Sequence, residues 1–392
     1  MRSSVSPPQF YCVSQSETFS GASFPLSYTA SHIQGSVPDS SVSRLGDNYK
    51  AVRIWLWCVA ALVLAMILVG GATRLTGSGL SITEWRPFMG AIPPLSEAAW
   101  LAEFDKYRAI PQYKLLNKGM SLGDFQFIYW WEWGHRQLGR FVGFAFMLPL
   151  AFFWLRGAVK GKLAIWLLTL GLLGGFQGAI GWIMVASGLK AGMIAVAPVK
   201  LALHLTTACL ILVGLVWTAR ALRPVAPAQA DLSSTVLRGA FSAKVVLALL
   251  LVQIALGALV AGSKSGLTYN TWPLMDGAFI PSIDGLFSMK PWIENFVANA
   301  ALVQFNHRMS AYLLLAFAVW HAFDLRSVKA GRGATHLALG ISVQAIIGIV
   351  TLLLVVPIWA GLLHQFFAAV LLIVGVIHAE KLNRERRVES IV

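Results

Sequence analysis

Long apolar runs fill most of the chain after residue 50, and several approach the ~20 residues that a helix needs to cross a lipid bilayer. Of the 392 residues, 57% are hydrophobic and only 12% are charged, and the mean hydropathy is +0.68. Soluble domains carry charge on about a quarter of their residues, so this composition excludes a soluble globular protein. Because lipid offers the backbone no hydrogen-bond partners, we expect an all-α polytopic membrane protein.

Eight transmembrane helices are expected, at residues 54–72, 138–156, 163–187, 201–219, 245–262, 308–325, 335–356 and 360–379. On one side of these spans lie the N-terminal tail, 156–162, 220–244, 326–332 and the C-terminal tail, with 4, 3, 4, 3 and 4 Lys and Arg, or 18 of 31. Positive charge in short segments marks the cytoplasmic side. Both termini are therefore predicted to be cytoplasmic, with the long loops 73–136 and 263–306 outside. The basic excess sets orientation and does not indicate nucleic acid.

The N-terminal residues 1–48 are rich in serine and lack an apolar signal-peptide core, so we expect a disordered cytoplasmic tail. Two arginines against three acidic residues make a poor transit peptide. This favours the inner membrane of a bacterial cell over that of a mitochondrion. None of the three cysteines lies in a long loop and no CxxC occurs, so we expect neither a structural disulfide nor a thiolate metal site.

The two halves of the chain repeat each other. A shift of 187 residues (257 − 70) aligns GSGLSITEWRPFMGAIPP (77–94) with KSGLTYNTWPLMDGAFIP (264–281), and GGFQGAIGW (174–182) later aligns with ISVQAIIGI (341–349). Because each copy contains four helices, both copies begin on the same side of the membrane. The expected architecture is therefore two parallel-repeat four-helix bundles. The expected organisation is tail 1–48, N-terminal half 49–222, cytoplasmic linker 223–240, C-terminal half 241–380 and cytoplasmic tail 381–392.

Four of the eight histidines fall at equivalent positions of the repeat. EWGHR (132–136) matches QFNHR (304–308), and KLALHLTTA (200–208) matches AGLLHQFFA (360–368). His135 and His307 are expected to open the second helix of each half, and His204 and His364 the fourth, near the outer membrane face. Two imidazoles at one depth suit a haem iron with two axial ligands. Small residues one turn further on leave room for a flat macrocycle: Gly139, Ala208, Ala311 and Ala368.

Arg136 and Arg308 follow two of these histidines and could pair with haem propionates, although snorkelling toward lipid headgroups explains them as well. One polar position beside these residues differs between the copies: Glu132 in the N-terminal half corresponds to Gln304 in the C-terminal half. Removing hydrogen from a substrate requires a proton acceptor. The N-terminal half is therefore predicted to carry out chemistry through Glu132, and the C-terminal half to store or relay electrons. The alternative is that Glu132 only pairs with Arg136 at i+4.

Other polar residues in the apolar runs receive structural interpretations. His321 and His378 each follow a predicted ligand by 14 residues (321 − 307 and 378 − 364); we expect core or interfacial histidines rather than a third haem site. Gln177, Gln253 and Gln344 are expected to form hydrogen bonds between helices. SEAAWLAEFDKYRAIP (96–111) is typical of a capped amphipathic helix at the membrane surface.

The segments GGATRLTGSGLSITEW (70–85), EWGHR (132–136) and NHR (306–308), together with the duplicated helices and histidine pairs, resemble the haem A synthase family over roughly residues 50–380. The resemblance implies an oxidoreductase of haem biosynthesis. It would oxidise the C8 methyl group of haem O to a formyl group, through a geminal diol that loses water, and so give haem A for terminal oxidases. Some family members have cysteine pairs in the outer loops, and this chain has none there.

By position, the resemblance implies that His135 and His204 hold the substrate haem O beside the catalytic Glu132, while His307 and His364 ligate a haem b cofactor. The partners to expect are membrane lipid, haem O, the haem O synthase that supplies it, and further copies of the chain. The electron acceptor stays open. A di-haem transmembrane electron-transfer cytochrome is the alternative: it explains four histidines but not the difference between Glu132 and Gln304. A haem carrier, the third class, would bind without turnover.

Overall fold

Seven long apolar helices dominate the computed structural model, which describes residues 39–86, 89–224, 234–329 and 331–387. Within those ranges every regular element is helical, so the prediction of an all-α polytopic membrane protein is confirmed. The candidate membrane spans are Tyr49–Leu75, Leu122–Leu155, Gly161–Gly188, Pro198–Ala221, Ser234–Gly262, Gly331–Leu353 and Ile358–Arg384. Cys58 and Cys209 are free thiols.

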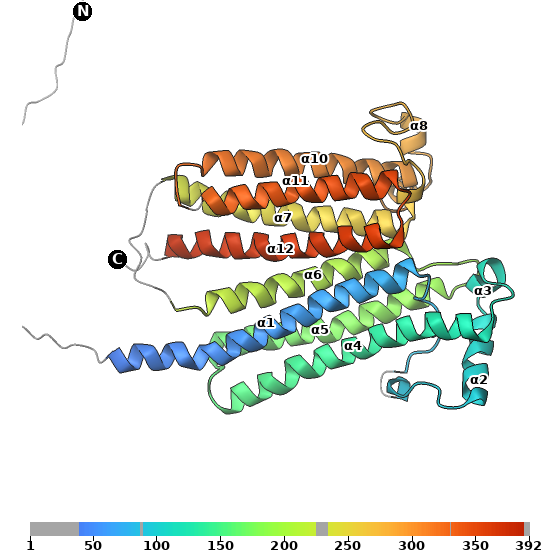
Figure 1. Ribbon diagram of the computed structural model, residues 1–392, viewed down its shortest axis with the longest axis horizontal. Helices are drawn as coiled ribbons and strands as arrows, with labels where there is room; N and C mark the ends of the chain where they lie inside the picture. The colour runs from blue at the N-terminus through green and yellow to red at the C-terminus, as the bar shows by residue number, and fades with distance from the viewer. Residues whose placement is uncertain (1–38, 87–88, 225–233, 330, 388–392) are drawn as a thin grey trace, which may run out of the picture. The chain divides into compact units, whose positions relative to one another are not determined.

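The long helices run alongside one another (Figure 1). They are α1 (Asp39–Leu75), α4 (Leu122–Leu155), α5 (Gly161–Gly188), α6 (Pro198–Ala221), α7 (Ser234–Gly262), α10 (Ala300–Asp324), α11 (Gly331–Leu353) and α12 (Ile358–Arg387). Helix α10 occupies the place of the sixth expected span, 308–325, and packs against α7 and α11. It falls outside the seven apolar spans because polar residues interrupt it, among them Asn306, Arg308 and Asp324.

Several predicted boundaries are wrong, mostly because helices continue past the apolar runs. Helix α4 begins at Leu122 rather than 138, since Ser121 and Asp124 form a reciprocal capping box. His135 therefore lies well inside α4 and does not open it, and the other three repeated histidines likewise lie one to two turns inside their helices. Residues 39–48 are helical, as are 234–240 of the expected linker and 381–387 of the expected tail. The predictions for 1–38 and 388–392 fall outside the described residues.

The chain divides into residues 1–42 and residues 43–392, and the helix packing lies within the second unit. Helices α6, α7 and α12 pack closely against one another, which joins the two sequence halves. On α12, Gln365 donates from Nε2 to the Ile67 carbonyl of α1, 2.5 Å away. Near the other end of α12, Arg384 binds the buried Glu380 at 2.6 Å and donates to the Arg220 carbonyl of α6 at 2.7 Å. Polar contacts thus fasten α12 to the N-terminal half at two levels.

Two short helices lie between α1 and α4, namely α2 (Glu97–Arg108) and α3 (Pro111–Leu116). Ser96 caps α2 by accepting from the Ala99 amide, which confirms the predicted capped helix. Phe104 and Tyr107 of α2 pack against Phe125 at the start of α4. Burial raises the pKa of Tyr107, and its hydroxyl donates to Gln112 Oε1 at 3.0 Å. This aromatic cluster supports the first turns of α4 beyond the apolar run and explains why hydropathy missed them.

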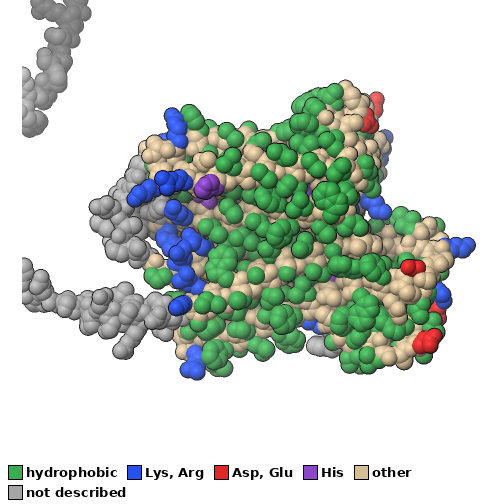
Figure 2. All heavy atoms as spheres, viewed as in Figure 1, with side chains coloured by type: hydrophobic (Ala, Val, Ile, Leu, Met, Phe, Trp, Pro, Cys, Tyr) green, Lys and Arg blue, Asp and Glu red, His purple; other side chains and the backbone are tan. Residues whose placement is uncertain are grey.

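Lysine and arginine side chains gather at one end of the helices, and the visible acidic side chains lie at the other (Figure 2). The basic end includes the α4–α5 turn, where Arg156 caps α4 and Lys160 precedes α5. It also includes the end of α6 at Arg220 and the start of α7 near Arg238. These residues come from the segments that the charge count assigns to the cytoplasmic side. The repeated histidines lie toward the opposite ends of their helices.

Candidate functional site

Each repeated histidine packs its ring against a glycine of the preceding helix in the same half. A Cβ atom added to these glycines would lie 3.0 Å from His135 Nε2 at Gly70, 3.0 Å from His204 Cε1 at Gly181, 3.1 Å from His307 Cε1 at Gly257 and 2.7 Å from His364 Cε1 at Gly348. The glycines are themselves equivalent, since 257 − 70 is 187 and both members of the other pair fall in the matched GGFQGAIGW and ISVQAIIGI segments. The structure therefore repeats a cradle for four imidazoles.

The two histidines of the C-terminal half face each other. The ring centres of His307 on α10 and His364 on α12 are 6.5 Å apart, with the ring planes at 83°. Metal–imidazole bonds of about 2 Å put two trans ligands at roughly this separation between ring centres. In the N-terminal half, His135 on α4 and His204 on α6 also interact electrostatically. The structure thus brings the histidines together in the two pairs that the sequence predicts.

Glutamines hold the C-terminal pair in place. Gln344 Nε2 donates to the His364 carbonyl at 2.9 Å and lies 3.1 Å from His364 Nδ1. Gln253 Nε2 donates to the His307 carbonyl at 3.1 Å and lies 3.1 Å from His307 Nδ1 and 3.4 Å from His307 Nε2. These contacts limit the rotation of both imidazole rings. The expectation that these glutamines bond between helices is confirmed, and their target is the histidine pair.

The N-terminal pair is held less tightly. Gln177 donates only to the His204 carbonyl, at 2.6 Å, and His204 Nδ1 is buried without a partner. Among the described side chains, none forms a hydrogen bond to a ring nitrogen of His135. The position equivalent to Gln253 is Met66 (253 − 187), which cannot donate a hydrogen bond. One site therefore has both rings fixed, and the other has rings that remain free to adapt to a ligand.

Glu132 is almost fully buried, 3% exposed, and both of its oxygens are engaged. Oε2 accepts from Ser81 Oγ at 2.8 Å and from the Ile82 amide at 2.9 Å. Oε1 pairs with Arg136 Nη2 at 2.6 Å. Since Glu132 precedes His135 by three residues, the carboxylate lies one turn away on the same face of α4. It therefore lies one helical turn from His135 and anchors the loop that follows α1.

The C-terminal half builds the same arrangement without the carboxylate. Arg308 Nη2 donates to the Tyr269 and Thr271 carbonyls at 3.0 and 2.9 Å, just as Arg136 donates to the Ile82 and Glu84 carbonyls at 2.9 and 3.2 Å. These loop residues are equivalent, because 269 − 82 and 271 − 84 both equal 187. Gln304 takes the place of Glu132 and donates to the Ser265 carbonyl at 3.1 Å. An amide therefore suffices to hold the loop.

The arginines predicted to bind propionates are largely occupied by their own loops. Among the described residues, Arg136 forms hydrogen bonds with Ile82, Glu84 and Glu132, whereas Arg308 Nε is buried without a partner there. Another basic residue, Arg74, lies in the last turn of α1. This residue follows the ring-contacting Gly70 by four, on the same face of α1, is partly buried, and has no hydrogen-bond or ion-pair partner among the described side chains. Its equivalent is Ala261 (74 + 187), so this cation belongs to the first site alone.

His321 and His378 form a separate buried pair on α10 and α12. Their Nε2 atoms are 2.9 Å apart, and Ser242 Oγ lies 2.7 Å from His321 Nδ1. An iron between two imidazoles would separate the nitrogens by about 4 Å, given two bonds of about 2 Å. The rings therefore bond to each other directly. The interpretation as core histidines is confirmed.

The residues at the two repeated histidine pairs fit haem. The ring separation of the C-terminal pair suits an iron between two imidazoles, and a glycine beside each of the four rings leaves space for the ring. Groups of three or more His, Cys, Asp and Glu that could hold a bare metal ion are absent from the described residues. The donor set is therefore two imidazoles per site, which suits a macrocycle that supplies the other four ligands to its own iron.

Comparison with known proteins agrees with this geometry. Residues 53–376 match the family described as cytochrome oxidase assembly protein, COX15-CtaA. The haem A synthase of Methylobacterium sp. (strain 4-46) is 60% identical over 337 residues, covering 84% of this chain and 91% of the relative. The haem A synthases of Methylobacterium radiotolerans and Brucella ovis are 59% and 52% identical, covering 86% of this chain and 92% and 93% of the relatives. The chain therefore belongs to the cytochrome oxidase assembly protein family and, within it, to the haem A synthases.

Proposed function

We propose that this chain oxidises the C8 methyl group of haem O to the formyl group of haem A. The observation that carries the proposal is the Glu132/Gln304 difference. Two copies of one loop-anchoring arrangement are built alike, and only the copy with loosely held imidazoles has a carboxylate. An electron-transfer cytochrome needs no such difference. Glu132 would accept the proton released as the methyl carbon is oxidised, and the family membership supports this reading.

The two imidazole pairs receive different ligands in this proposal. His135 and His204 bind the iron of the substrate haem O, since a substrate must enter and leave a site whose rings are not fixed by hydrogen bonds. His307 and His364 bind a resident haem b, since Gln253 and Gln344 hold both rings. Bound haem b would supply one-electron storage next to the reaction. The protein residues orient the rings, exclude bulk water and hold the proton at Glu132.

Arg74 is the residue of the first site best suited to a haem propionate. It has no hydrogen-bond or ion-pair partner among the described residues, and it lies one turn further along α1 from the glycine that touches His135. A carboxylate on the substrate would give it a charge-assisted partner. At the second site the partnerless Nε of Arg308 is the corresponding donor. Arg136 would act instead by holding the outer loop over Glu132.

In this proposal α10 is the eighth membrane span, and the two halves form parallel four-helix bundles. The support is its 25-residue length, its packing between α7 and α11, and the position of its polar residues toward the bundle. The basic end seen in Figure 2 faces the cytoplasm with both termini. The haem sites then lie near the outer face of a bacterial inner membrane.

The proposed function predicts a specific product. When the chain is co-expressed with a source of haem O, extracted haems are expected to contain haem A in addition to haem b, resolved by chromatography and mass. The same cells with an empty vector provide the control. If only haems b and O are found, with haem O bound but never converted, the chain would be a di-haem cytochrome or a haem carrier instead.

The glycine cradle gives a second prediction. Gly181→Val should push the His204 ring aside, because even a Cβ atom at this position approaches Cε1 to 3.0 Å. Haem O binding and conversion are expected to fall roughly 10–100-fold, the range seen when the support of a metal ligand is lost, with haem b retained. Gly178→Val is the matched control, since Gly178 lies on the same helix and has open space around it. Equal losses in both variants would mean that α5 tolerates no valine here and that the ring contact is irrelevant.

A further inference from the structure

One polar side chain joins α12 to α1. Gln365 directly follows His364 on α12, and its Nε2 donates to the Ile67 carbonyl of α1 at 2.5 Å. The amide fills the space beside Gly71, because a Cβ atom added to this glycine would lie only 2.6 Å from Gln365 Nε2. Ile67 and Gly71 are four residues apart and lie on the same face of α1. A side chain of the C-terminal half therefore packs directly against the backbone of the first helix.

The backbone that Gln365 contacts also supports the first histidine pair. Gly71 directly follows Gly70, whose Cβ position is 3.0 Å from His135 Nε2. Since none of the side chains that the structure describes bonds a ring nitrogen of His135, the position of this ring depends on its packing against α1. A small shift of α1 at Gly70 would therefore move the ring. The Gln365 amide holds α1 at the level where this contact is made.

The equivalent contact between the halves is apolar. Helices α6 and α7 correspond to α12 and α1, and they pack closely against each other. The equivalents of Gln365, Ile67 and Gly71 carry no polar side chain: Leu205 (365 − 160), Ile254 (67 + 187) and Ala258 (71 + 187). Apolar packing is therefore enough to join the two halves. The amide and the glycine that admits it occur together only beside the first pair, where a side-chain hydrogen bond ties the helices to each other.

We propose that Gln365 is a positioning residue of the substrate site. Its amide fixes α1 against α12 so that Gly70 supports the ring of His135. The inference rests on the proposed function for the assignment of haem O to this pair, and it deepens that function by making the substrate site depend on a residue of the cofactor half. The second pair does not depend on this bond, because Gln344 holds the ring of His364.

Gln365→Leu tests the proposal, since Leu205 shows that a leucine fits the equivalent contact. The affinity for haem O, titrated into the purified full-length holoprotein in nanodiscs, is expected to fall roughly 10–100-fold, the range seen when the support of a metal ligand is lost. Electron paramagnetic resonance of the haem O that still binds should show a larger high-spin fraction, because His135 is displaced. The content and the low-spin signal of resident haem b should stay normal. Gly71→Ala should give the same result, because its Cβ atom displaces the amide.

The double variant Gln365→Leu/Gly71→Ala separates the hydrogen bond from packing. It copies the apolar contact of Leu205 and Ala258, so its packing is restored while the bond is still missing. We expect it to remain as defective as Gln365→Leu. Recovery of haem O affinity in the double variant would show that packing alone matters and would overturn the proposal. Normal haem O affinity in Gln365→Leu, or a parallel loss of haem b, would overturn it as well.

Leu363→Ala is the matched control on the same turn of α12. Its side chain is 44% exposed, and its loss should change neither the haem O affinity nor the haem b content. An equal loss of affinity in this control would mean that any change on this turn disturbs the site, which also contradicts the proposal. If the affinity and the spin state follow Gln365 but the unsubstituted protein forms no haem A, the proposed function fails and the positioning role stands.

Discussion

Glu132→Gln is expected to lower the conversion of haem O to haem A by roughly 10²–10⁴-fold, the contribution typical of a positioned acid–base group. The substitution removes the proton acceptor and little else. Gln304 shows that an amide at this place still holds the outer loop, because it donates to the Ser265 carbonyl while Arg308 binds the Tyr269 and Thr271 carbonyls. Haem A formation is measured by mass and haem b content by pyridine haemochrome spectra.

The repeat also provides the control for this substitution. Gln304→Glu places a carboxylate in the second half, where it should pair with Arg308 as Glu132 pairs with Arg136, and it should leave conversion near normal. Glu132→Gln with substantially normal conversion would show that neither proton acceptance nor the charge of Glu132 is needed, and that its hydrogen bonds to the loop are its whole role. Loss of haem b along with conversion would show that the carboxylate is needed for folding, and the catalytic assignment would have to be dropped.

Much of the site could be predicted because the chain contains two copies of it. The histidine pairs, the match of Gln177 with Gln344 and the difference between Glu132 and Gln304 all follow from aligned residues. The cradle glycines were visible as matched positions, but only the structure shows that each touches an imidazole. A repeat identifies which positions matter, whereas the identity of the neighbour depends on helix rotation, which sequence spacing leaves undetermined.

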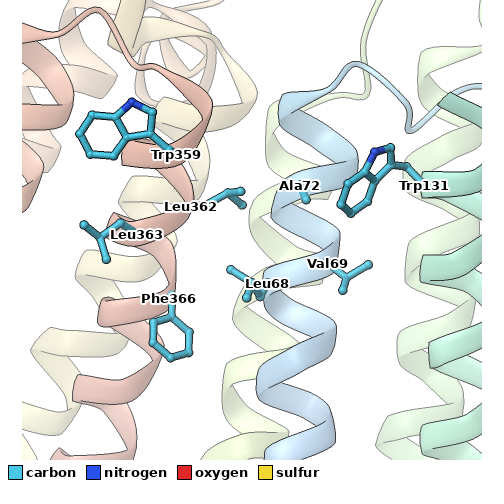
Figure 3. Close-up of a pocket in the computed structure, with 8 residues that line it drawn as sticks. All are labelled: Leu68, Val69, Ala72, Trp131, Trp359, Leu362, Leu363 and Phe366. Carbon is cyan, nitrogen blue, oxygen red and sulfur yellow. The ribbon is translucent and has the colours of Figure 1, made fainter. Parts of the chain in front are cut away.

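Three features could not be predicted, for physical reasons. The early start of α4 depends on the Ser121–Asp124 capping box and on aromatic contacts to Phe104, and hydropathy registers neither. The occupation of Arg136 by loop carbonyls depends on the path of residues 82–84. The apolar groove between α1, α4 and α12 (Figure 3) is lined by residues far apart in the sequence, namely Leu68, Val69, Ala72, Trp131, Trp359, Leu362, Leu363 and Phe366. Each depends on tertiary packing rather than on local pattern.

Removing a ligand from each imidazole pair should separate the two haems. His307→Ala and His364→Ala each remove an iron–imidazole bond and leave one glutamine without a ring to orient. We expect the affinity for haem b to fall by more than the roughly 10–100-fold that is lost when only the hydrogen-bond partner of a metal ligand is removed. Conversion should fall with it. His135→Ala and His204→Ala should keep haem b but fail to retain or convert haem O. Haems that co-purify with each variant are identified by mass and by redox spectra.

His336→Ala serves as the control, since this exposed histidine of α11 lies outside both pairs and its loss should change neither haem. The opposite pattern, in which His135→Ala loses haem b and His307→Ala keeps it, would reverse the halves. That reversal would contradict the structural argument directly. It would place the resident cofactor between rings without hydrogen bonds at their nitrogens, and the exchanging substrate between rings that Gln253 and Gln344 hold. A ligand that must leave after each turnover needs the adaptable pair, so the haem b content of these variants decides which half carries out the chemistry.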